Sequence, residues 1–127
     1  MDEGLEPDER RRQLREQPVI AVEPRDGATV VRLGGELDLY NAPVLREALI
    51  AAAQAGPTRL VIDLSEVEFI DSTALGALVE ARGKLAPRSP LLLAAPQPEA
   101  RRALQVSGLD RHLTVHDTVD AALAAPA

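Results

Sequence analysis

Apolar residues along this chain follow two spacings, one typical of strands and one typical of helices. Five short runs rich in Val, Ile and Leu predict β-strands at residues 19–23, 28–34, 59–64, 91–94 and 113–116. The first two runs flank Asp26-Gly27, a dipeptide that is common in hairpin turns. We therefore expect the first two strands to form a hairpin.

Amphipathic stretches separate the later strands. Four helices are predicted with the following limits: from the cap Asn41 to Gly56, from Ser72 to Leu85, from Pro98 to Ser107, and from the cap Asp117 onward. Helices and strands then alternate, which implies right-handed crossovers between parallel strands. The predicted fold class is α/β, with a mixed, mostly parallel β-sheet, an N-terminal hairpin and about four helices.

The length of 127 residues suits a single domain. Residues 1–17 hold ten charged side chains and few apolar ones, too few to offset the entropy of ordering, so they predict a flexible charged extension. The cluster at residues 10–12 is interpreted as solvated charge, with contact to an acidic partner as the alternative. Residues 18–124 are then the folded domain and residues 125–127 a frayed tail.

Composition removes several classes of function. A net charge of -6 and only two aromatic residues, Tyr40 and Phe69, disfavour binding to nucleic acid. The lack of cysteine excludes thiol chemistry and suits a reducing cytoplasm. We see no membrane span and no signal peptide. The glycine patterns that bind nucleotides are also missing, so no cofactor is expected. His112 and His116 are interpreted as surface residues, and no metal site is expected.

The segment Asp71-Ser72-Thr73 is the most informative part of the sequence, because a hydrophobic run gives way there to polar residues at a helix start. Free backbone N–H groups and the helix dipole would accommodate a phosphate on Ser72 or Thr73. Such a phosphate would leave the fold intact and add up to about two negative charges at the surface. The alternative is that Asp71 or Ser72 is simply the helix cap.

A wider pattern surrounds this segment: Gly35-Glu36-Leu37-Asp38, Val61-Ile62-Asp63-Leu64, Phe69-Ile70-Asp71-Ser72-Thr73 with Leu75-Gly76, and Ser107-Gly108-Leu109. In order and spacing these pieces resemble a STAS domain, and the stand-alone bacterial anti-anti-sigma factors in particular. The resemblance covers residues 18–124. The sequence departs from the family motif at Ala74, where the family usually has Gly. The added methyl group could change how closely an enzyme that phosphorylates Ser72 approaches it.

The resemblance implies an anti-sigma factor antagonist that works by partner switching. The unphosphorylated form would bind an anti-sigma factor that is also a serine kinase and so release a sigma factor. Phosphorylation at Ser72, with Thr73 as the second choice, would end that binding, and a serine phosphatase is a further expected partner. The residues expected to bind the partner are Asp38, Tyr40, Asp71, Ser72, Thr73 and Leu75.

Some of these assignments leave alternatives open. Asp38 either contacts the partner or supports the turn before Tyr40. Tyr40 is either an exposed interface anchor or packs over the helix start, and Phe69 is expected in the core.

Other functions are possible on the same sequence. A hydrolase built on Ser72 and a histidine lacks the Gly-x-Ser-x-Gly elbow, so the chain is expected not to be an enzyme. The remaining alternative is a constitutive STAS scaffold subunit of a signalling complex or a lipid-transporter assembly.

Overall fold

A computed structural model describes residues 4–126, and the predictions made for residues 1–3 and 127 lie outside this range. In chain order, the elements of the described part are α1 (Pro7–Glu16), β1 (Val19–Arg25), β2 (Ala28–Leu37), α2 (Ala42–Gln54), β3 (Leu60–Ile70), α3 (Ser72–Gly83), β4 (Leu91–Ala94), α4 (Pro98–Ser107), the 3-10 turn Leu109–Arg111, β5 (Thr114–His116) and α5 (Val119–Ala124).

The strands form one sheet in the order β1-β2-β3-β4-β5. β1 and β2 are antiparallel and meet at Asp26-Gly27, where both residues have positive φ, as a tight hairpin turn requires. The remaining neighbours, β2 with β3, β3 with β4 and β4 with β5, are parallel. The predicted α/β fold with an N-terminal hairpin and a mostly parallel sheet is confirmed.

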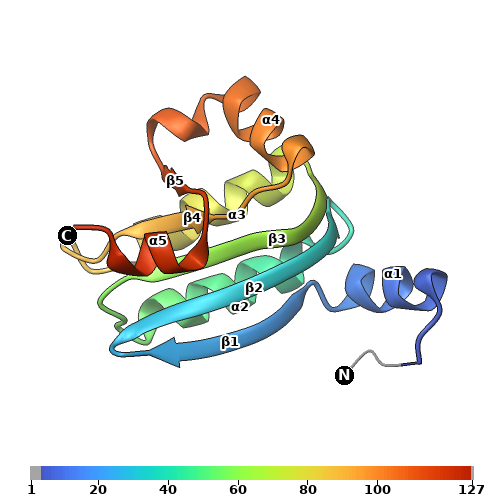
Figure 1. Ribbon diagram of the computed structural model, residues 1–127, viewed down its shortest axis with the longest axis horizontal. Coiled ribbons are helices and arrows are strands. Elements are labelled where there is room, and N and C mark those ends of the chain that lie inside the picture. The colour runs from blue at the N-terminus through green and yellow to red at the C-terminus, as the bar shows by residue number, and fades with distance from the viewer. Residues whose placement is uncertain (1–3, 127) are drawn as a thin grey trace.

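Helices cover both faces of the sheet (Figure 1). α2, α3 and α4 pack on one face and enclose the larger apolar cluster with alternate residues of β2 and β3. α5 packs on the opposite face, where Ala122 meets Val30, Val61 and Leu92. No helix within residues 4–126 is long and apolar enough to cross a membrane.

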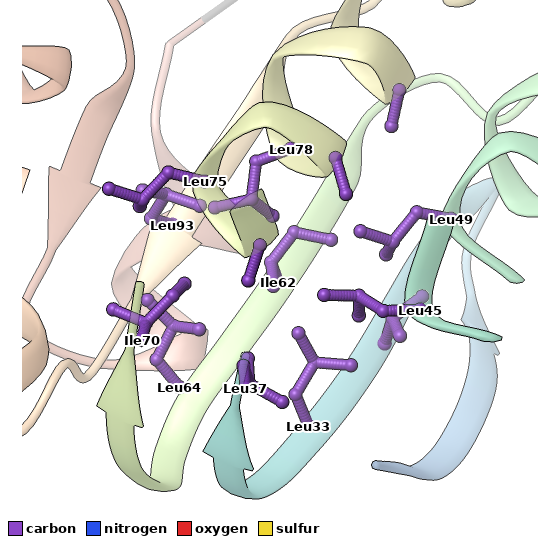
Figure 2. Close-up of a cluster of buried hydrophobic side chains, with 14 of the residues drawn as sticks. Leu33, Leu37, Leu45, Leu49, Ile62, Leu64, Ile70, Leu75, Leu78 and Leu93 are labelled. Carbon is purple, nitrogen blue, oxygen red and sulfur yellow. The ribbon is translucent and has the colours of Figure 1, made fainter. Parts of the chain in front are cut away.

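The main core holds the start of α3 firmly against the sheet. Figure 2 shows its principal side chains between the sheet and the two central helices: Leu33, Leu37, Leu45, Leu49, Ile62, Leu64, Ile70, Leu75, Leu78 and Leu93. Strand residues two apart and helix residues three or four apart supply them, because those spacings return to one face. The junction between β3 and α3 is thereby anchored on both sides, by Ile70 and Leu75.

β3 is longer than predicted and changes the place of Phe69. The strand continues to Ile70 because it pairs with β2 up to that residue, whereas β4 accompanies it only from Leu60 to Asp63. Beyond Asp63 the strand lacks this neighbour, and Phe69 is 44% exposed. The prediction that Phe69 lies in the core was wrong, and Ile70 occupies the inward position instead.

Two further details differ from the sequence-based expectation. The last helix is capped by Thr118, whose hydroxyl oxygen accepts a hydrogen bond from the Ala121 N–H at 2.9 Å. Asp117 is instead exposed and pairs with Arg101.

The other difference concerns residues 7–16, which form the helix α1 within what was expected to be a flexible charged extension. Glu6 and Glu9 form a capping box at its start, and Leu14 is buried against β2. Local hydrogen bonds, ion pairs and one buried leucine stabilise α1, although it has little apolar surface to bury.

Candidate functional site

The candidate site lies where β3 ends and α3 begins. Asp71 has an extended backbone there, and its Oδ1 accepts a hydrogen bond from the Ala74 N–H at 3.0 Å. Asp71 is therefore the helix cap, which decides between the two cap candidates of the motif. Ser72 and Thr73 follow in the first turn, and both are exposed.

The second carboxylate oxygen of Asp71 connects α3 to the loop that follows β2. Leu39 N–H donates to Oδ2 at 3.2 Å, and Asp71 N–H donates to the carbonyl of Leu37 at 3.0 Å. We call residues 38–41 the 38–41 loop. It is held directly beside the start of α3 by these two bonds.

The 38–41 loop is shaped by two polar side chains. Asp38 accepts the Tyr40 N–H at 3.0 Å through Oδ1, so its turn role is present in the structure. Asn41 was expected to cap α2, but it makes no side-chain cap bond. It is buried instead, accepts the Asp38 N–H at 3.0 Å and donates to the carbonyls of Glu36 at 2.8 Å and Arg15 at 3.0 Å.

Tyr40 projects from this loop and is 61% exposed. The guanidinium carbon of Arg15 lies 4.9 Å from the centre of its ring, within the range of a cation–π contact. Arg15 Nη1 also donates to Asp38 Oδ2 at 2.8 Å. Tyr40 is thus steadied by α1 while most of its ring remains open to solvent.

An open groove of about 480 Å³ runs between α2 and α3 beside the motif. It is lined by Leu39, Ala42, Pro43, Arg46, Glu47, Thr73, Gly76, Ala77 and Glu80. Leu39 is 72% exposed at its edge, and the sequence analysis missed it. The signal that would have revealed it is a leucine between two polar residues in a short loop.

Arg46 of α2 and Glu80 of α3 form an ion pair across this groove. Arg46 Nε donates to both carboxylate oxygens of Glu80 at 2.8 Å, and Nη2 lies 2.6 Å from Oε2. The hydrogen bonds from Arg46 lower the pKa of Glu80, and the same contact raises the pKa of Arg46. The pair ties the two helices that border the groove.

Two residues of the motif face the core rather than the surface. Leu75 was expected to contact a partner, but it is 5% exposed and packs in the main apolar cluster. It lies one turn before Leu78 on the face of α3 that packs against the sheet, so we remove it from the candidate surface. The methyl group of Ala74 is also buried, and it therefore does not obstruct access to Ser72.

The structure places His116 away from Ser72. His116 pairs with Ala94 in the sheet, and Ala94 pairs with Asp63. Asp63 precedes the end of β3 by seven residues, roughly 20 Å along a strand. Within the described residues, no group of three or more His, Asp or Glu side chains is arranged to hold a metal ion.

The arrangement suits recognition of another molecule: it has an exposed hydroxyl at a helix start, a loop held by hydrogen bonds with Leu39 and Tyr40 exposed on it, and a groove.

Comparison with known proteins adds an independent finding. A family model described as STAS domain matches residues 19–122. The anti-sigma-F factor antagonist RsfB of Mycobacterium tuberculosis (strain H37Rv) is 35% identical over 104 residues, which are 82% of this chain and 85% of the relative.

Solved structures show the same similarity. An anti-sigma factor antagonist from Mycobacterium paratuberculosis superposes with a TM-score of 0.77 at 39% identity, covering 81% of this chain and 88% of that one. The anti-sigma factor antagonist SpoIIAA in its unphosphorylated form gives 0.68 at 25% identity, covering 81% and 91%. The phosphorylated form of SpoIIAA, from Bacillus, gives 0.61 at 25% identity, covering 81% and 95%.

Proposed function

This chain belongs to the STAS domain family, and from that premise we propose that it is an anti-sigma factor antagonist. Its unphosphorylated form binds an anti-sigma factor that is also a serine kinase, and a sigma factor is thereby released. The observation that carries the proposal is the exposed Ser72 at the start of α3, where Asp71 binds the loop that bears the exposed Leu39 and Tyr40. The relative RsfB and the two solved structures named as anti-sigma factor antagonists above support the same function.

We define the docking surface as Leu39, Tyr40, Ser72, Thr73 and the groove between α2 and α3. Its exposed apolar side chains and neutral hydroxyls suit a protein partner, and tyrosine is enriched at such interfaces. Asp38 and Asp71 use their carboxylates to hold the 38–41 loop and the start of α3. These two carboxylates fix the shape of the docking surface and do not themselves contact the partner.

A phosphate on Ser72 would switch this surface. The free N–H groups and the dipole at the start of α3 favour negative charge, so the fold would keep its shape. The partner, matched to a neutral hydroxyl, would meet about two new negative charges that must be desolvated. Penalties of this type reach about 2–5 kcal/mol, whereas about 1.4 kcal/mol already changes affinity tenfold.

The first experiment identifies the partner by capture with the tagged protein from its own cells. We expect a small serine kinase. Capture of transporter subunits or of a large signalling complex, with no kinase, would overturn the proposal and favour the constitutive scaffold.

The second experiment tests the switch with the captured kinase. We expect Ser72→Ala to bind it persistently and Ser72→Asp to bind it at least about tenfold more weakly in titration calorimetry, a difference of about 1.4 kcal/mol. Thr114→Ala, which changes an exposed threonine of β5 outside the docking surface, is the control and should bind like the wild type. Equal affinities of the Ala and Asp variants would contradict the switch. Mass spectrometry after incubation with kinase and ATP should find phosphate on Ser72; phosphate on Thr73 alone would refute the residue assignment.

A further inference from the structure

α1 lies outside residues 19–122, the range that matches the STAS domain model. It nevertheless packs against β2 and the 38–41 loop, which shape the docking surface. Leu14 rests on β2 at Gly34 and Gly35. A Cβ atom on Gly35 would lie 2.9 Å from the Leu14 Cβ, and one on Gly34 would lie 3.4 Å from Leu14 Cδ2. Gly35 also has a φ of +78°, which disfavours any side chain. Gly35 therefore leaves the space that Leu14 occupies, whereas a Cβ on Gly34 would clash with Ile20 Cδ1, at 2.6 Å, rather than with Leu14.

Arg15, the next residue, contacts the 38–41 loop in three ways. Its guanidinium pairs with Asp38 at 2.8 Å, its charged group lies over the Tyr40 ring, and its carbonyl accepts the Asn41 side-chain N–H at 3.0 Å. The side chain of Asp38 is consequently only 20% exposed. Arg15 therefore touches three of the four residues in the loop.

These contacts continue to Ser72 through a short chain of bonds. The 38–41 loop is joined to Asp71 by the Leu39 N–H, and Asp71 caps the helix on which Ser72 lies. Both sides of the docking surface thus depend on the loop conformation that Arg15 contacts.

α1 itself is weakly held. It has ten residues, below the length at which isolated helices are stable in water, and Leu14 is its single buried residue. Its ion pairs with the sheet and with Asp38 of the loop are partly exposed, and such pairs contribute little each. Docking of α1 is therefore easily shifted.

We propose that Arg15 is a positioning residue of the docking surface: α1, packed on β2 at Gly35, holds the 38–41 loop in the form that the partner binds. Loss of α1 leaves Asp38 without its cation and makes the partner order the loop during binding, which lowers affinity. The consequence for the partner rests on the proposed function; the effect on the loop does not.

The first test uses the free protein and nuclear magnetic resonance. In Arg15→Ala we expect the amide signals of Leu39 and Tyr40 to move and their hydrogen exchange to quicken by about fivefold or more, the low end of typical coupling. Leu14→Asp, which disrupts the packing of Leu14 at Gly35, should produce the same changes and release the α1 signals. Unchanged Leu39 and Tyr40 signals in Arg15→Ala would overturn the proposal.

Arg12→Ala is the matched control, because Arg12 lies on the same helix and makes no ion pair with a residue that the structure describes. It should leave the Leu39 and Tyr40 signals in place. Global melting should be the same in both arginine variants, whereas a merely structural role for Arg15 would lower it. A response of the loop to Arg12→Ala equal to that for Arg15→Ala would refute the role of Arg15.

The second test measures binding of the captured kinase to the unphosphorylated full chain. We expect Arg15→Ala to bind about fivefold or more weakly, Arg15→Lys to recover part of the loss, and Arg12→Ala to bind like the wild type. Equal affinity of Arg15→Ala and wild type would overturn the positioning role. If the wild type binds no anti-sigma kinase, the proposed function fails, while the loop measurement still decides whether Arg15 positions the loop.

Discussion

The two carboxylate oxygens of Asp71 serve different parts of the molecule. Oδ1 caps α3 by accepting the Ala74 N–H, and Oδ2 accepts the Leu39 N–H from the 38–41 loop. Charged acceptors of this kind make stronger hydrogen bonds than neutral ones. Because Asp71 fills both roles, the hydroxyl of Ser72 is not needed as the cap and stays available at the surface.

Asp71→Ala removes both acceptors and should lower the free energy of unfolding by about 1–2 kcal/mol, the usual cost of a lost cap. Asp71→Asn keeps one oxygen for the Ala74 N–H and should cost less. Ser72→Ala, as the control, should stay within about 0.5 kcal/mol of the wild type. Denaturant unfolding measures all three, and a Ser72→Ala loss as large as that of Asp71→Ala would reassign the cap to Ser72.

At the scale of elements, α2 and α3 border the groove, and an ion pair links them across it. Arg46 and Glu80 meet with three short N–O contacts, and the hydrogen bonds lower the pKa of Glu80. A carboxyl group with a lowered pKa in the folded state stabilises the fold above its unfolded-state pKa. That contribution is lost as the pH falls through the lowered folded-state pKa.

Arg46→Gln should therefore raise the pKa of Glu80 toward its ordinary value, because the charged hydrogen-bond donor is gone. A carboxyl-detected magnetic resonance titration measures the change directly. Arg101→Gln breaks a different exposed pair, that with Asp117, and should leave Glu80 as it is. An unchanged Glu80 titration in Arg46→Gln would show that the ion pair does not persist in solution.

At the scale of the whole molecule, the sheet separates two apolar clusters and carries the docking surface beyond the ends of β2 and β3. The larger cluster lies under α2 and α3, and Leu64 is fully buried within it. Phe69, five residues later on the same strand, is 44% exposed where β3 extends beyond β4. The larger of the two side chains therefore contributes less to the core.

Leu64→Ala should lower the free energy of unfolding by about 2–5 kcal/mol, because it opens a cavity in a packed core. Phe69→Ala should cost at most about 1 kcal/mol, since a half-exposed ring leaves no enclosed cavity. Denaturant unfolding with an unchanged slope would check both values. A larger loss for Phe69→Ala than for Leu64→Ala would contradict the exposure of Phe69 and support its placement in the core.

The order and type of elements from residue 19 onward follow from local information. Apolar spacing, the Asp26-Gly27 turn and Gly108, which has a positive φ at the end of α4, are legible in the sequence because each depends on near neighbours. The motif at Asp71-Ser72-Thr73 was also visible, with its place at a helix start. The docking role of these residues remains a proposal.

Contacts between distant segments decided the rest. Whether Phe69 or Ile70 faces the core depends on how far β2 and β4 accompany β3, and the exposure of Leu39 depends on a bond to Asp71, 32 residues away. The helix α1 is the clearest case. Its sequence is too polar to predict order, and it gains a packed leucine only because Gly35 leaves room for Leu14 on a strand that folds beside it.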